Sequence, residues 1–247
     1  MTRLVSIGGA ELLLLWRNRF ALLNALVVPP AFGLLFIPQL AEAGMDPATG
    51  ATLAGGMIGV VLAIVVYYNL VSAYVARREE LTLKRLRSGT LNAAEIIAGT
   101  ASPAVAIALA QSLLIVVITA VFLDLPMPAN PVLLAIGLIG GVAMFVVLAA
   151  ASSIITGTVE LAQITTTPML LACFLGAGLM FPLSTLPGPV ETAFTLLPLG
   201  PVVELITIGW AGTDTPADAI RPLLLLVAWV AAGTTIIQRW FRWEPRR

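Results

Sequence analysis

The chain has 247 residues, of which 59% are hydrophobic and 11% are charged, against roughly 25% charged residues in soluble domains. A soluble fold cannot enclose so much apolar surface, so the composition predicts an all-α integral membrane protein. A net charge of zero argues against nucleic acid as a partner, and the absence of histidine excludes histidine-ligated metal and imidazole catalysis.

Six apolar segments are long enough to span a membrane, because a helix needs about 20 apolar residues to cross the bilayer core. The predicted spans are residues 20–40, 53–75, 97–123, 132–156, 164–181 and 220–238. The tripeptide Ala41-Glu42-Ala43 is similar to a signal-peptide cleavage site, but the apolar run before it is longer than a signal peptide requires. We therefore expect the first segment to be a span.

A seventh apolar stretch, 190–210, lies within the segment 182–219 that precedes the last span. It is interrupted by Pro198 and Pro201, and it carries Glu204. Irregular backbone at membrane depth has to be buried in protein, so this stretch favours two short half-helices that enter the membrane and return. Two additional spans are the alternative interpretation.

The basic residues predict the orientation. Twelve of the thirteen lie before the first predicted span, between the second and third, or after the sixth, and Arg221 is the exception. Because basic residues gather in cytoplasmic loops, both termini are expected in the cytoplasm, and an even number of spans requires the same. Residues 1–19 read as a helix lying in the cytoplasmic interface, with an extension of the first span as the alternative.

The loop between the second and third spans, 77–95, carries five basic and three acidic residues. Leu83 and Leu86 would share one face of a short helix, which Ser88-Gly89-Thr90 would end. Asn92 and Glu95 have the spacing of a capping box that begins the next helix. We expect a short charged helix that docks on a partner; a solvated loop that only sets the orientation is the alternative.

Several kinds of chemistry are missing from the sequence. No GxxxxGK[ST] motif is present, so no ATP site is expected in this chain. We expect no metal site and no catalytic residues. No acid falls clearly at the middle of a predicted span, which disfavours a carrier driven by an ion gradient.

The order of these features resembles the ABC-2 type permease family, the membrane subunit of type-2 ABC transporters, including daunorubicin-resistance-like exporters. The family loop after span two reads roughly R-x-E-x-G-T-L-x-x-L-x-x-(T/S)-P-L. The matching residues are Arg78, Glu80, Thr82, Leu83, Leu86 and Leu91. The departures are Leu81, where the family often has glycine, and Gly89-Thr90 near the usual Thr-Pro. The family motif F-P-x-x-x-L-P is matched by Phe181, Pro182, Leu186 and Pro187.

The resemblance implies a multi-pass exporter of the bacterial inner membrane. If the pathway is as apolar as the spans, its expected substrate is hydrophobic or amphiphilic, such as a drug or a lipid. Its implied partners are a second permease, as a copy or a paralogue, and two cytoplasmic P-loop ATPase subunits that bind ATP and Mg²⁺. The loop at 77–90 becomes the coupling helix. The expected docking residues are Glu79, Glu80, Thr82, Lys84, Arg85 and Arg87. The expected pathway residues are Tyr68, Asn69, Thr166, Met169 and Phe174.

Two other classes of function stay open at this point. A gradient-driven secondary transporter or a channel would work without an ATPase. A membrane-embedded enzyme or a structural subunit would show no transport.

Overall fold

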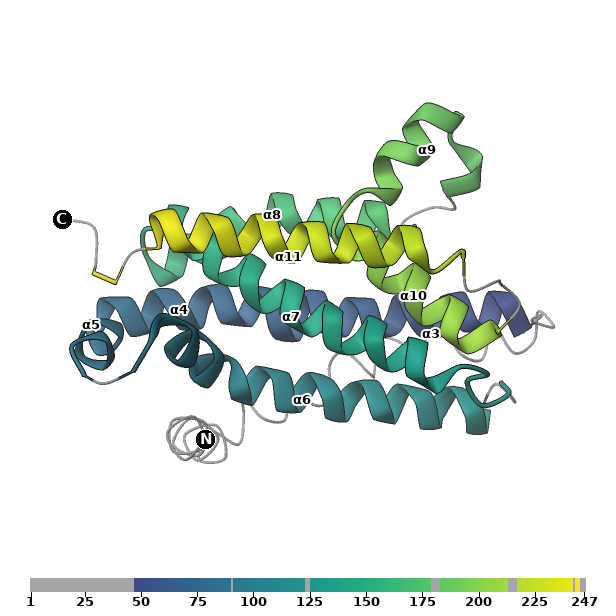
Figure 1. The fold of residues 1–247 in the computed structure, drawn as a ribbon, viewed down its shortest axis with the longest axis horizontal. Helices are drawn as coiled ribbons and strands as arrows, with labels where there is room; N and C mark the ends of the chain where they lie inside the picture. Colours follow the sequence, from purple (N-terminus) through teal and green to yellow (C-terminus); the bar gives the residue numbers. More distant parts are fainter. Residues whose placement is uncertain are drawn as a thin grey trace.

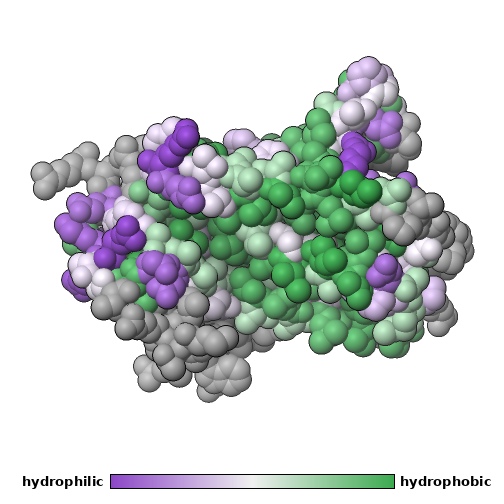
Figure 2. Space-filling view, in the orientation of Figure 1, coloured by the Kyte–Doolittle hydropathy of each residue, from purple (hydrophilic) through white to green (hydrophobic). Residues whose placement is uncertain are grey.

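The computed structural model describes residues 47–89, 91–122, 125–178, 183–212, 217–241 and 243–244. Every regular element in these ranges is a helix, and the long helices lie side by side along one axis (Figure 1). The predicted interfacial helix at 1–19 and the predicted span at 20–40 lie outside the described residues. Figure 2 shows an apolar surface along the middle of the bundle and polar residues toward its ends, as a membrane-spanning bundle requires.

The predicted span 53–75 belongs to one continuous helical segment of 32 residues, Ala48–Glu79. It consists of α3 (Pro47–Val61), a π-helical stretch η1 (Leu62–Tyr68) and α4 (Asn69–Glu79). The segment is longer than predicted at both ends, because polar residues continue the helix beyond the apolar run. The π-helix was not predicted, since no proline or polar insertion marks it; such stretches are frequent at functional sites.

Four more helices correspond to predicted spans: α6 (Ala93–Phe122), α7 (Pro131–Ile155), α8 (Val159–Gly176) and α11 (Ile220–Trp240). Five described helices are therefore long and apolar enough to cross a membrane. The prediction for α8 was wrong by five residues at each end, because Thr158 precedes the helix in extended conformation and Gly178 ends it with a φ of 68°. Glu160 lies in the first turn of α8, where a carboxylate interacts favourably with the helix dipole.

The half-helices predicted within 190–210 are present as α9 (Gly188–Thr195) and α10 (Leu199–Ala211), and they meet at 88°. A short 3₁₀ turn, η2 (Leu183–Thr185), precedes them. The indole Nε1 of Trp229, in the middle of α11, donates to the carbonyl oxygen of Leu196 at 2.9 Å. The bend between α9 and α10 therefore lies alongside the middle of α11, about 13 Å from the beginning of that helix.

Helix α10 packs against both α3 and α7, and glycines bring the three backbones close together. A Cβ added at Gly59 on α3 would lie 2.9 Å from a methyl carbon of Val203. A Cβ added at Gly141 on α7 would lie 2.7 Å from a methyl carbon of Val202. These contacts confirm the small-residue packing typical of membrane helices.

The bundle has two distinct ends. The charged end carries α5 (Thr82–Arg87), the beginning of α6, the ends of α7 and α11, and residues 243–244. The far end carries the beginning of α7 and the end of α10, where the amide of Asn130 donates to the carbonyl oxygen of Gly209 at 2.8 Å. Helix α9 projects sideways from the bundle toward the far end (Figure 1).

Candidate functional site

The candidate site is the short helix α5 at the charged end, joined to α4 by two residues. Helix α4 ends at Glu79, Glu80 is its C-cap, and Leu81 begins α5 as its N-cap. Leu81 has a φ of 57° and a ψ of 13°, the left-handed conformation that lets a chain leave a helix abruptly. This single residue turns the backbone, so α5 projects from the end of α4.

Leu81 has a left-handed conformation at the position where the family motif often has glycine. Glycine adopts this conformation without a steric penalty, whereas a residue with a Cβ does so at a cost of roughly 1 kcal/mol. Leu81 is the only non-glycine described residue with a positive φ. The backbone at this corner therefore has the conformation that glycine would adopt, and the side chain of Leu81 is 40% exposed.

Leu83 anchors α5 to the bundle. Its side chain is 1% exposed, whereas Leu86 is half-buried. Arg85 is two positions after Leu83, so it points away from the bundle at about 200° around the helix, and its side chain is exposed. The predicted short helix is confirmed, with a buried leucine on one face and basic side chains on the others.

The predicted end of α5 and beginning of α6 are also confirmed. Helix α5 ends at Arg87, with Ser88 as its C-cap. The amide of Asn92 donates to Glu95 Oε2, and the amide of Glu95 donates to Asn92 Oδ1, both at 2.8 Å. This reciprocal pair is the capping box that the spacing predicted.

Arg78 connects this corner to α7, a contact that the sequence analysis did not anticipate. Its guanidinium is 2% exposed and donates from Nη1 to the carbonyl oxygen of Ser153 at 2.8 Å. Nη2 donates to the carbonyl oxygen of Thr156 and lies 3.4 Å from that of Gly157. A cation bound to the last carbonyls of a helix stabilises its negative end, so Arg78 caps α7 from another helix. The signal in the sequence that could have drawn attention to Arg78 is its position as the first residue of the family motif.

The six predicted docking residues lie together at this corner, but they differ in their contacts. Glu80 Oε2 pairs with Arg77 Nη1 at 3.1 Å and lies 3.5 Å from the hydroxyl of Thr82. Glu79 and Arg85 are exposed. Lys84 and Arg87 both contact the segment after α11, which is described below. That these residues dock on a partner stays a prediction.

The predicted pathway residues come from two elements that pack against each other, η1–α4 and α8. Tyr68 is half-buried and Asn69 is exposed. Thr166 is buried, and its hydroxyl donates to the carbonyl oxygen of Ala162 at 2.7 Å within the same helix. Met169 and Phe174 pack against the core. Their role in a pathway stays a prediction.

Two neighbouring tyrosines bond the same segment to other spans. Tyr67, the residue before Tyr68 in η1, lies 3.0 Å from the hydroxyl of Ser152 on α7. Tyr74 on α4 donates to the carbonyl oxygen of Ile97 on α6 at 3.0 Å. Together with Arg78, these side chains join η1–α4 to two other helices through polar contacts that face the interior.

An acidic residue lies farther inside the bundle than the sequence indicated. Glu204 is in the middle of α10, the half-helix packed against α3 and α7, and it is half-buried. An ionisable residue in such a place is costly and is often functional.

Two comparisons with known proteins bear on this arrangement. The sequence model of the family described as ABC-2 type transporter matches residues 2–209. No curated protein matches the chain. The match covers most of the sequence, including α5, its corner with α4 and all but the last two residues of the bent pair α9–α10. The chain is therefore a multi-pass membrane permease of the ABC-2 type transporter family.

Proposed function

We propose that this permease is the transmembrane subunit of an ATP-driven exporter. It pairs with a second permease, as a copy or a paralogue, and binds two cytoplasmic P-loop ATPase subunits, which hold ATP and Mg²⁺. Helix α5 is the coupling helix seated on the ATPase. The observation that carries the proposal is a charged helix that projects from the longest span and is anchored to the bundle by Leu83.

The charges of the described residues support the orientation this proposal needs. Arg77, Lys84, Arg85 and Arg87 lie at the charged end, whereas Arg221 begins α11 near the far end. By the positive-inside rule, the charged end faces the cytoplasm, where the ATPase is. Both termini then lie in the cytoplasm, and the bent pair α9–α10 enters from the outer side.

The contacts around Arg78 support a route from the ATPase to the membrane. A displacement of α5 acts on Leu81 and Arg78, and Arg78 is bonded to the end of α7. The segment η1–α4, which carries Arg78, packs against α8, and α8 carries Thr166 and Met169. ATP-driven closure of the ATPases thus moves α4, α7 and α8 together and changes access to the pathway. The apolar lining of these spans favours a hydrophobic or amphiphilic substrate.

Replacing the exposed charged residues of 79–87 with serine, while Leu83 and Leu86 are kept, tests the proposal in proteoliposomes that contain permease and ATPase. We expect ATP hydrolysis to continue and transport to stop, while the permease keeps its melting temperature. Normal transport by this variant would contradict the role of α5.

Glu204 favours one alternative, a carrier driven by an ion gradient. Carriers of that class place ionisable groups and broken helices at membrane depth, and α9–α10 with Glu204 has both features. Transport by the permease alone, driven by a pH or sodium gradient and abolished by Glu204→Gln, would support the carrier.

A further inference from the structure

The segment that follows α11 returns to α5. Phe241 is the C-cap of α11 and has extended backbone, and its half-buried ring packs against the core. The ring of Trp243 lies against that of Phe241, edge to face, with 4.7 Å between centroids. Phe241 therefore holds the indole of Trp243 near the charged end of the bundle.

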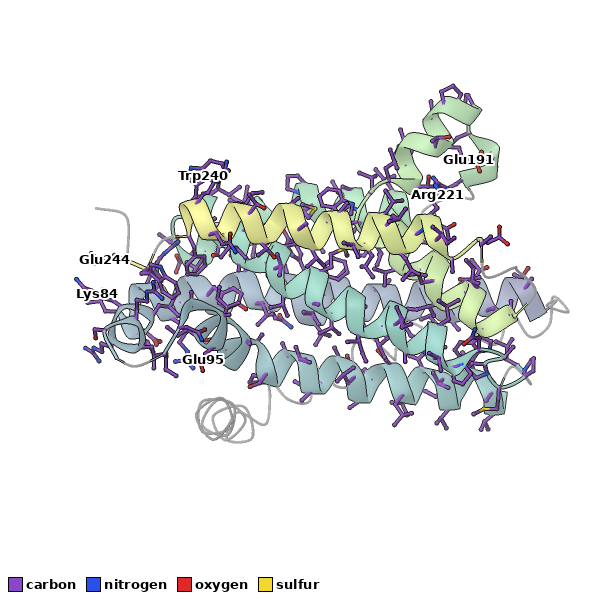
Figure 3. The ribbon with its side chains drawn as sticks, viewed as in Figure 1. Lys84, Glu95, Glu191, Arg221, Trp240 and Glu244 are labelled. Carbon is purple, nitrogen blue, oxygen red and sulfur yellow. The ribbon has the colours of Figure 1, made fainter. Side chains whose placement is uncertain are left out.

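Two side chains of this segment contact α5. Glu244 Oε1 lies 3.0 Å from Lys84 Nζ, and Figure 3 shows the two residues close together. The Cζ atom of Arg87 lies over the indole ring of Trp243, 5.1 Å from its centroid. Because Lys84 and Arg87 are three residues apart, they share one face of α5. The segment thus binds α5 through an ion pair and a cation–π contact on the same face.

These contacts occupy the flank of α5 and leave its outer side open. Taking the direction of buried Leu83 as zero, Arg87 and Lys84 lie at about 40° and 100° around the helix, and Arg85 at about 200°. Arg85 is exposed, and so is Leu81 at the corner. Trp243 and Glu244 therefore widen the surface that α5 presents and do not cover it.

The segment also changes the charge of that surface. Helix α5 carries Lys84, Arg85 and Arg87 within four positions. Glu244 neutralises the first of them, and the face of the indole attracts the third. Arg85 is the remaining cation of α5, and its side chain is exposed.

We propose that Trp243 and Glu244 form, together with α5, a single docking surface for the ATPase subunit. This inference rests on the proposed function. The matching groove on the ATPase has an acidic group for Arg85 and an apolar wall for the indole of Trp243. Exposed ion pairs and cation–π contacts are individually weak, so the segment modulates an interaction that α5 dominates.

The test is a titration of the full-length permease, in nanodiscs, with the P-loop ATPase that copurifies with it. We expect Trp243→Ala to weaken binding about two- to fivefold, the range expected for one exposed cation–π partner. Trp240→Ala is the matched control, because Trp240 is exposed on α11 and lies on the side away from α5 (Figure 3). We expect this control to bind as the wild type does.

A charge exchange tests the ion pair separately. Glu244→Lys places two cations together and is expected to weaken binding about threefold, an effect in the range of exposed ion pairs. The double variant Lys84→Glu/Glu244→Lys restores the pair and is expected to recover part of the loss, because Lys84 is itself a proposed docking residue. Melting temperatures within a degree or two of wild type, in every variant, would show that the fold is kept.

The outcomes separate the two proposals. If wild-type permease binds no ATPase, the proposed function falls and this inference falls with it. If wild type binds but Trp243→Ala binds equally well, or the charge exchange recovers nothing, the inference alone is overturned. Tighter binding by Trp243→Ala would also overturn it, because the segment would then compete with the ATPase for α5.

Discussion

The guanidinium of Arg78 donates a hydrogen bond to the carbonyl oxygen of Ser153, 75 residues later in the chain, at 2.8 Å. This bond and the one to Thr156 join the last turn of α4, directly before α5, to the end of α7. Hydrogen bonds from a buried cation are strong because they are charge-assisted. The corner and the bundle are thereby linked directly beside α5.

Replacing Arg78 is therefore expected to destabilise the permease. Arg78→Ala leaves the carbonyl oxygens of Ser153 and Thr156 without their cationic donor in a buried place, at a cost of roughly 3 kcal/mol. A melting curve in detergent should shift down by about 5–10 °C. Arg77→Ala is the control, because Arg77 forms a partly exposed ion pair with Glu80. Equal melting temperatures for the two variants would contradict the structural role of Arg78.

Leu81→Gly is expected to stabilise the corner. It removes the steric penalty of a left-handed residue with a Cβ, offset in part by the greater freedom of glycine in the unfolded chain. The net gain is at most about 0.5 kcal/mol, seen as a small rise in melting temperature. Leu86→Gly, inside α5, is expected to lower stability. A fall in melting temperature for Leu81→Gly would show that the leucine side chain stabilises the permease by more than its left-handed backbone costs.

Gly209 is a position where even one methyl group should disturb the packing of α10. A Cβ there would lie 2.6 Å from the backbone nitrogen of Leu134, and a backbone cannot yield as a side chain does. We expect Gly209→Ala to destabilise the permease by about 1–3 kcal/mol, the range of an overpacked core. Gly188→Ala is the matched control, because a Cβ on Gly188 meets nothing within 4 Å. Comparable stability of the two variants would argue against tight contact between α10 and α7.

Tyr67 and Ser152 should show a small, specific coupling across η1 and α7. Their hydroxyl oxygens are 3.0 Å apart. Hydrogen bonds between membrane helices contribute about 0.6 kcal/mol on average, so a double-mutant cycle with Tyr67→Phe and Ser152→Ala should give a coupling of that size. Additive effects of the two changes would mean that the hydroxyl groups do not stabilise each other.

Much of the fold follows from local sequence signals. Long apolar runs predicted the spans because the bilayer core requires about 20 apolar residues, and Asn92 with Glu95 predicted the beginning of α6. The π-helix in η1 could not be predicted, because no residue type specifies it. The limits of Ala48–Glu79 were also missed, since Arg77 and Arg78 continue a helix that hydropathy alone would end.

The candidate site could be predicted only where its residues are close in sequence. Helix α5 was predicted because its leucines and charges lie within one loop. The bonds from Arg78 to α7, and from Lys84 to Glu244, join residues 75 or more positions apart, and nothing local indicates such partners. The position of Glu204 inside the bundle could not be predicted for the same reason, because it depends on how α10 packs against α3 and α7.

The most direct test of the account is to purify the tagged permease from its native cells in nanodiscs and identify its partners by mass spectrometry. The account predicts a stoichiometric P-loop ATPase that is lost when Glu80→Lys and Arg85→Glu are combined, although the variant keeps its melting temperature. A preparation that contains no ATPase, even after crosslinking, and that transports substrate with an ion gradient alone would contradict it.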